Sequence, residues 1–205
     1  MYTRDRTALR RALTMALLMV ATVVVSTGAA AAAPRDRTVT IATIPVLERE
    51  PAQDDHCVAE VESQEADGEL VLTEPRCYDT FSEAITDASE GEVSLDSETP
   101  GSAALTENGL QSMLGNFTIG IHYNGSNGTG SSIVIKGSAC TGGWWNTGST
   151  WGNKISSSYN GCYRLRHYDY SNKQGMNAAT TGAGAVRNLS SIMNNKTNSV
   201  SYHSS

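Results

Sequence analysis

Apolar and polar residues alternate in short runs after residue 113, which is the pattern of half-buried β-strands. Between the runs the chain is rich in Gly, Ser, Thr and Asn, and helical periodicity is weak. Strand-length runs cover residues 117–123, 132–136 and 162–168. Asn-Gly pairs, which favour tight hairpin turns, begin at Asn124, Asn127 and Asn160. We therefore predict an all-β domain over residues 114–205.

This domain contains a degenerate internal repeat. The stretch FTIGIHYNGSNGTG from Phe117 returns 45 residues later as CYRLRHYDYSNKQG from Cys162. A second stretch, WGNKISSSY from Trp151, returns 42 residues later as MNNKTNSVSY from Met193. A repeat of this length indicates one supersecondary unit used twice. Two units are too few for a solenoid, so we expect them to pack face to face as one compact domain.

The segment before this domain carries its own pattern of strands and a helix. Two apolar runs of strand length flank Asp67-Gly68, which favours a hairpin turn. Thr80 and Glu83 have the spacing of a capping box, which predicts a short helix through about Ser89. We expect a small ββα unit within residues 34–91 and a linker over residues 92–113.

Charge separates this segment from the domain that follows it. Residues 34–113 hold 19 Asp and Glu against 4 Arg, whereas residues 114–205 hold one acid, Asp169, against 7 Lys and Arg. Opposite charge favours contact between neighbouring segments, within a Debye length of about 8 Å in physiological salt. Two interpretations stay open: a specific acidic propeptide that contacts its own domain, or a solubilising leader.

Residues 1–33 have the three parts of a secretory signal peptide: four arginines, an apolar run over residues 12–25 and a small-residue end. The apolar run is too short to span a bilayer, which takes roughly 20 residues. We expect a secreted, extracellular protein with no membrane contact.

The four cysteines are expected to form two disulfide bonds in that oxidising setting, Cys57 with Cys77 and Cys140 with Cys162. Each would close a loop of a little over 20 residues and contribute roughly 3 kcal/mol in the chain-entropy model. Zinc is disfavoured because the chain has no CxxC or HxxxH spacing.

The repeated motifs resemble those of the βγ-crystallin family. The stretch 168–175, YDYSNKQG, is similar to the aromatic, acidic, aromatic and glycine signature of that family's folded hairpin, and residues 123–130 form a looser copy. Residues 152–157 and 194–199, here named the first and second clamps, resemble the family's calcium-binding stretches. The resemblance covers about 90 residues and implies two Greek-key units in a β-sandwich.

The resemblance also implies calcium ligands. They are Asn153, Ser156, Asn194, Asn195 and Asn198. Gly152 and Asn198 depart from the family's pattern, and no clamp position carries a carboxylate. Affinity for Ca²⁺ rises with ligand charge, so binding is expected at roughly 10⁻⁴ to 10⁻³ M or weaker. The alternative is that Ser157 and Ser199 close turns by hydrogen bonds and the clamps bind no ion.

Enzymatic activity is not expected. The domain has no GxSxG motif or catalytic cysteine pattern, and His122 and His167 occupy equivalent repeat positions with only one acid nearby in sequence. For binding, Trp144 and Trp145 are candidates for an exposed platform that takes sugar rings, whereas Trp151 is expected in the core because its repeat partner is Met193. Nucleic acid is not expected, because the basic residues are scattered and match no known motif.

Small secreted proteins of the βγ-crystallin type include metalloprotease inhibitors and killer-toxin-like proteins, and the resemblance implies a role of this kind. We therefore expect a secreted, non-enzymatic binding protein, with peptidase inhibition as the leading activity. The segment between Cys140 and Cys162 is the expected inhibitory loop. The alternatives are a calcium-stabilised structural module, a toxin-like antimicrobial protein or a carbohydrate-binding protein. The partners implied are a secreted protease or a cell-wall glycan, besides the chain's own acidic segment.

Overall fold

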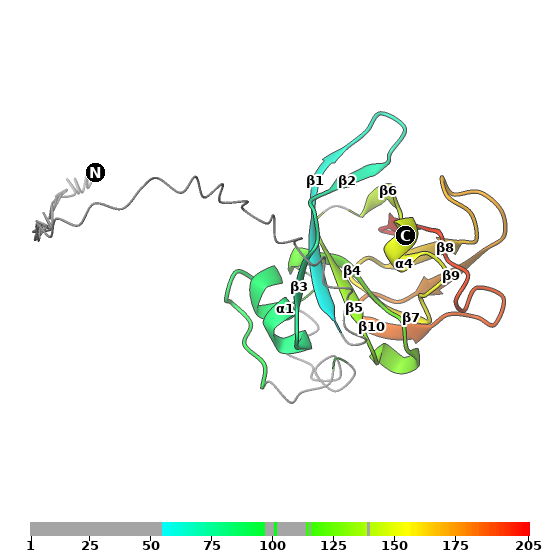
Figure 1. Ribbon diagram of the computed structural model, residues 1–205. Coiled ribbons are helices and arrows are strands. Elements are labelled where there is room, and N and C mark those ends of the chain that lie inside the picture. The colour runs from blue at the N-terminus through cyan, green and yellow to red at the C-terminus, as the bar shows by residue number, and fades with distance from the viewer. Residues whose placement is uncertain (1–54, 97–100, 102–113, 115, 139) are drawn as a thin grey trace, which may run out of the picture. The chain divides into compact units, whose positions relative to one another are not determined.

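The computed structural model describes residues 55–96, 101, 114, 116–138 and 140–205. These residues belong to one compact unit, Leu47–Ser205. The expected signal peptide and most of the expected linker lie outside the described residues. The fold is mostly β, with two sheets and few short helices (Figure 1).

The first sheet contains seven strands in the order β10-β7-β4-β5-β1-β2, with β3 also paired to β1. Its strands are β1 (His56–Gln64), β2 (Leu70–Leu72), β3 (Arg76–Tyr78), β4 (Thr118–Tyr123), β5 (Ser132–Lys136), β7 (Ser157–Asn160) and β10 (Ala185–Asn188). All pairs are antiparallel except β1 with β5, which run parallel. The acidic segment therefore contributes strands to the same sheet as the repeat domain.

The second sheet contains four antiparallel strands in the order β6-β11-β8-β9. They are β6 (Thr141–Asn146), β8 (Arg164–Tyr168), β9 (Asn177–Thr181) and β11 (Ser199–His203). The two repeat units exchange strands: β6 comes from the first unit but pairs with β11, and β10 comes from the second unit but pairs with β7. Two short helical turns complete the repeat domain, η1 (Ser126–Gly128) and α4 (Gly148–Trp151).

One apolar core lies between the sheets. It contains Ile119 and Ile133 from the first sheet, Leu165 and Val200 from the second, and Trp151 with Met193 at repeat-equivalent positions. Trp151 is 7 % exposed and Met193 is fully buried, which confirms that Trp151 belongs to the core.

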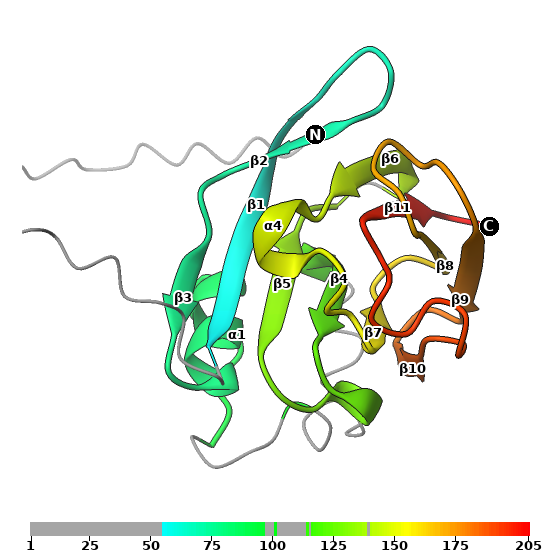
Figure 2. The same cartoon turned by 45° about the vertical axis from the view of Figure 1, so that its right-hand side comes forward.

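A second core lies on the outer face of the first sheet. Helix α1 (Phe81–Ala88) covers this face, and Figures 1 and 2 show it beside β1, β3 and β5, away from the second sheet. Phe81 and Ile85 of the helix pack with Ile121, Val134 and other residues of the sheet. The acidic segment thus supplies the cover for an apolar face that the repeat domain cannot cover itself.

The helix begins where the capping box predicts. The Thr80 hydroxyl accepts a hydrogen bond from the Glu83 amide, and the Glu83 carboxylate accepts one from the Thr80 amide. The Asp67-Gly68 turn also joins β1 to β2 as expected. Strand β3 was not predicted, because three residues are too few to show a pattern, so the segment is more than a ββα unit.

The β1–β2 hairpin reaches from the first sheet to the second (Figure 2). Glu69 forms an isolated parallel bridge with Trp144 of β6, and the Trp144 amide donates to the Gly68 carbonyl at 3.0 Å. The acidic segment therefore lies along β5 in one sheet and against β6 in the other.

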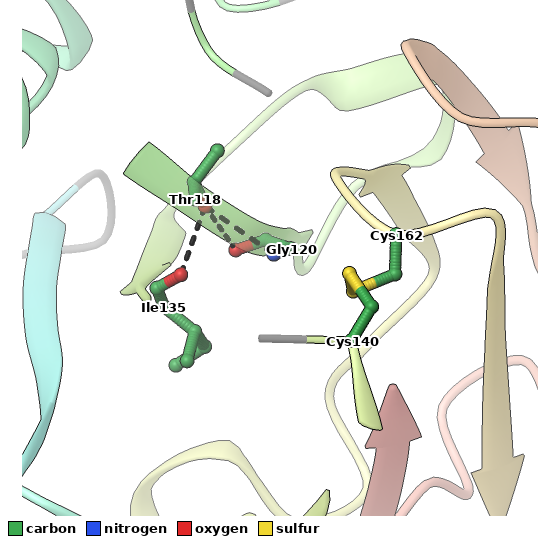
Figure 3. Close-up of a disulfide and its surroundings, with 5 residues drawn as sticks. All are labelled: Thr118, Gly120, Ile135, Cys140 and Cys162. Atoms are coloured by element: carbon green, nitrogen blue, oxygen red, sulfur yellow. Dashed lines mark hydrogen bonds between the residues drawn. A yellow bond between two sulfur atoms is a disulfide. The ribbon is translucent and has the colours of Figure 1, made fainter. Parts of the chain in front are cut away.

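Both expected disulfides are present. Cys57–Cys77 joins directly opposite residues of β1 and β3. Cys140–Cys162 joins the residue before β6 to a residue two positions before β8, and so ties the two repeat units together next to β4 (Figure 3). Close by, the Thr118 hydroxyl donates to the carbonyls of Ile135 and Gly120 where the β4–β5 register shifts.

Candidate functional site

The two folded hairpins predicted from the repeat have the same backbone geometry. The Gly125 amide donates to the Thr129 carbonyl at 3.0 Å, and the equivalent Tyr170 amide donates to the Gln174 carbonyl at 3.3 Å. Gly130 and Gly175 both have positive φ, 73° and 78°. A Cβ at either position would collide with the side chain of Asn124 or Asp169 respectively, so both positions require glycine.

Two serines close these hairpins in the same way. The Ser157 hydroxyl donates to the Gly125 carbonyl at 2.6 Å and accepts from the Gly128 amide at 2.9 Å. The Ser199 hydroxyl donates to the Tyr170 carbonyl at 2.7 Å and accepts from the Lys173 amide at 3.1 Å. The turn-closing role expected for both serines is therefore present in each unit.

The structure also brings the two clamps together. The Asn153 amide donates to the Thr197 carbonyl at 2.9 Å, and the Asn195 amide donates to the Ile155 carbonyl at 3.0 Å. Asn153 and Asn195 both have positive φ, 59° and 55°. Each clamp therefore forms the same turn and binds the main chain of the other.

Four of the five expected calcium ligands form two hydrogen-bonded pairs, and the fifth, Asn194, belongs to neither pair. The Ser156 hydroxyl donates to the Asn195 side-chain oxygen at 2.9 Å. The Asn198 side-chain amide donates to the Asn153 side-chain oxygen at 3.0 Å. Asn194 is exposed, and its main-chain amide donates to the Ser190 carbonyl.

The Asn153–Asn198 pair does not fit a cation. The side-chain nitrogen of Asn198, Nδ2, faces three oxygens. They are the Asn153 side-chain oxygen at 3.0 Å and the main-chain carbonyl oxygens of Asp169 and Lys196 at 2.8 and 3.3 Å. Two of these are main-chain carbonyls, which cannot donate, so the amide must point its NH₂ group toward them. The side chain therefore supplies donors where a cation needs oxygen ligands.

The Ser156–Asn195 pair is different, because both of its side-chain atoms are oxygens and Ca²⁺ is bound by oxygen ligands. Within the described ranges no group of three His, Cys, Asp or Glu could hold a metal ion. A cation here would thus be held by hydroxyl, amide and main-chain oxygens alone.

The two repeat-equivalent histidines meet between the sheets. Both are fully buried, and their rings lie edge to face with centroids 5.8 Å apart. His122 contacts the Ser158 hydroxyl at 2.8 Å and the Tyr202 hydroxyl at 3.0 Å, whereas neither ring nitrogen of His167 has a partner among the described residues. Burial, together with the neighbouring His167, holds the pKa of His122 well below its usual value, and burial lowers the pKa of His167 to about 3. Both rings are therefore neutral at pH 7.

The two candidate tryptophans do not form an exposed platform. Trp144 is only 3 % exposed, with the β1–β2 turn against its indole and the Lys173 ammonium 5.3 Å from its ring centroid. Trp145 packs against the core, and its ring lies 5.9 Å from that of His122. Both tryptophans therefore contribute apolar surface to the packing of the domain and are not displayed to a ligand.

The segment between Cys140 and Cys162 is likewise not a free loop. It consists of β6, α4 and β7, and both strands are paired within a sheet. The sequence suggested a rigid loop because a disulfide ties both ends of the segment, but its strands form part of the sandwich.

Sequence reasoning missed a group of polar and basic side chains on the outer face of the second sheet. These side chains are those of Arg164, Arg166, Ser201 and His203, at alternate positions of β8 and β11. The alternation of polar and apolar residues in these two stretches could have predicted that they share one face of a sheet. The intervening residues, Leu165, His167, Val200 and Tyr202, are all fully buried.

Comparison of the chain with protein-family models, with curated proteins and with solved structures found no match.

Proposed function

We propose that this protein is a secreted, non-enzymatic binding protein of the βγ-crystallin type. The observation that carries the proposal is that equivalent hydrogen bonds form in the two repeat units. Each unit contains the same folded hairpin, the same serine that closes it and the same clamp turn. Strand exchange between the units further supports a pair of Greek keys.

Export is supported by the two disulfides, which are typical of oxidising compartments. It is also supported by the signal-peptide pattern of residues 1–33. No helix in the described part of the chain combines the length and apolar character needed to cross a bilayer.

We infer that the acidic segment stays part of the working protein rather than being discarded as a propeptide. Its removal would uncover Ile121, Tyr123, Val134 and Tyr159 on the first sheet, each fully buried. Lys136 adds ion pairs to Glu60 and Glu90 of the segment, at 3.9 and 2.5 Å. These pairs are partly exposed, so strand pairing and apolar burial contribute most of the contact energy.

Calcium enters the proposal as one weak site. The Ser156 and Asn195 oxygens are its side-chain ligands, and the Asn153–Asn198 pair is closed by its own amide. Bound there, the ion would supply cross-linking between the two clamps, and so between the two repeat units.

Matched glycine variants test the site. Asn153 and Asn195 occupy equivalent positive-φ positions, which glycine tolerates. Melting of residues 34–205 in 10 mM calcium and in chelator should show a stabilisation of about 1.4 kcal/mol at ten times a millimolar dissociation constant. Asn195→Gly should abolish this shift and Asn153→Gly should retain it. An unchanged melting temperature in the unmodified chain, or equal loss in both variants, would contradict a single site.

Peptidase inhibition through the segment between Cys140 and Cys162 gains no support from the described residues, because its strands are paired into the two sheets. Binding through an exposed face is the function that the geometry supports best.

A further inference from the structure

We propose that the outer face of the second sheet binds the sulfate or carboxylate groups of an acidic polysaccharide. We call this surface the basic face. It consists of Arg164, Arg166, Tyr168, Lys173, Ser201 and His203. The inference concerns a site separate from the clamps and does not depend on calcium binding.

The sheet register places these residues on one side. On β8, Arg164 and Arg166 are two residues apart and so point the same way, about 7 Å from each other along the strand. On the neighbouring β11, Ser201 lies opposite Arg166 and His203 lies opposite Arg164. The intervening Leu165 is fully buried against the other sheet, which fixes the arginines outward.

Lys173 completes the cluster from the second folded hairpin. Its amide donates to the Ser199 hydroxyl, and its ammonium lies over the Trp144 ring, 5.3 Å from the centroid. Trp144 is the register partner of Ser201 on the opposite side from Arg166. Cations therefore stand on both flanks of Ser201.

Neutral polar side chains accompany these cations, with Ser201 buried beneath Tyr168 and His203. The Ser201 hydroxyl lies 2.8 Å from Nε2 of His203 and 3.5 Å from the Tyr168 hydroxyl. Ser201 itself is fully buried, so the partly exposed Tyr168 and His203 are the neutral polar side chains available to sugar hydroxyls. The face thus alternates positive charge with neutral polar groups.

No carboxylate of the described residues neutralises the three cations. The ion pairs of the described chain involve Arg76 and Lys136 instead. Arg166 donates to the neutral Asn177 side chain, and the Nε of Arg164 is buried without a partner. The pKa of His203 is lowered by its partial burial and then by Arg164, Arg166 and Lys173, so this ring is neutral at pH 7 and adds no charge of its own.

Uncompensated cations on a partly buried face are complementary to oxyanions, and arginine forms paired hydrogen bonds with sulfate-like and carboxylate groups. A polysaccharide suits the neutral polar side chains of Tyr168 and His203, which accompany the cations. A nucleic acid would gain from exposed stacking surfaces, but Trp144 on this face is 97 % covered. The two disulfides are typical of proteins in oxidising compartments, which include the extracellular space.

The test measures binding of residues 34–205 to four probes at low salt by calorimetry: heparin, polyglucuronate, a neutral cello-oligosaccharide and a DNA duplex. Arg164→Gln with Arg166→Gln removes two cations from the basic face. Lys154→Gln with Lys196→Gln removes two exposed lysines from the clamp turns and serves as the charge-matched control. Melting curves of both double variants check that the fold is retained.

The proposal predicts binding of heparin or polyglucuronate that weakens as salt screens the charges. Loss of both arginines should weaken binding at least about tenfold, since one charged hydrogen bond alone is worth that much. The lysine control should change binding less than about threefold, as distant screened charges do. Absence of binding to both acidic glycans, equal loss in the two double variants, or equal or tighter binding of the neutral sugar or of DNA would overturn the proposal.

Discussion

The two repeat units share their inward-facing residues and differ on their outward faces. His122 and His167 both lie between the sheets, as do Trp151 and Met193. Outward, however, the fully buried Ile121 of the first unit corresponds to Arg166 of the second, 45 residues later. Tyr159 corresponds to Ser201, 42 residues later, where the aromatic residue is replaced by a small polar one although both are fully buried.

This difference follows from what covers each sheet. The acidic segment lays α1 over the first sheet, so outward residues there became part of a core. The described residues cover the outer face of the second sheet only in part: the β1–β2 turn lies against Trp144, whereas Arg164 and Arg166 stay partly exposed and Lys173 is exposed. The duplicated scaffold thus has one outer face buried in a core and one outer face on which cations keep part of their exposure.

A reciprocal exchange of outward residues would break the comparison most strongly. Ile121→Arg places a charge under the helix without a partner, which should cost at least about 4 kcal/mol or prevent folding. Arg166→Ile removes a partly exposed charge and should change the free energy of unfolding by less than about 1 kcal/mol. Urea unfolding of both variants measures this, and similar losses would show that the two faces are equally covered.

Removing each disulfide in turn distinguishes the contribution of the acidic segment from that of the repeat domain. Cys140→Ser with Cys162→Ser frees the link between the repeat units, and Cys57→Ser with Cys77→Ser frees the link within the acidic segment. Each should lower the free energy of unfolding by about 3 kcal/mol. Amide exchange should rise in β1, β3 and α1 for the second variant while β8 and β9 stay protected. Faster exchange in β8 and β9 there would contradict a locally acting cover.

The histidine pair makes the shared interior sensitive to acid. The folded-state pKa of both rings is lowered from 6.5, so the folded chain binds fewer protons than the unfolded chain below that pH. Stability should be complete above about pH 6.5 and fall as the pH drops, by about 1.4 kcal/mol per pH unit for each ring that stays neutral in the folded chain, which for His167 extends to about pH 3. His167→Leu should remove about half of the slope between pH 6 and pH 5 in unfolding titrations. If the dependence of the free energy of unfolding on pH did not change, the acid sensitivity would come from groups other than His167.

The smallest predicted effect concerns helix α1 of the acidic segment alone. Thr80→Ala removes the helix cap and should cost about 1 kcal/mol, whereas Thr86→Ala inside the same helix should be neutral or slightly stabilising. Thermal melts of the two variants provide the comparison, and equal melting temperatures would mean that the capping box contributes nothing to the cover.

Local signals in the sequence predicted what is held by local interactions. The capping box located α1, the Asp67-Gly68 turn located the first hairpin, and the repeat located paired turns whose bonds agree in both units. The disulfides were predictable because four cysteines gave two short loops. In each case residues close in sequence determine the geometry.

Long-range pairing was not predictable in the same way. Nothing local in residues 56–60 specifies that they run parallel to residues 132–136, because parallel pairing depends on the tertiary fold. The continuous burial of Cys57, Val58 and Ala59 reflects cores on both faces of that strand. The closure of one clamp pair by Asn198 also depends on the Asp169 carbonyl and the Asn153 side chain, which come from distant parts of the sequence.

Amide hydrogen exchange of β1 in the intact chain tests the central claim most directly. If the acidic segment is built into the first sheet, amides of residues 57–60 should exchange as slowly as those of residues 133–135, since both open only with the whole unit. Rapid exchange in residues 57–60, with residues 133–135 still protected, would show that the segment is a detachable leader and contradict the account.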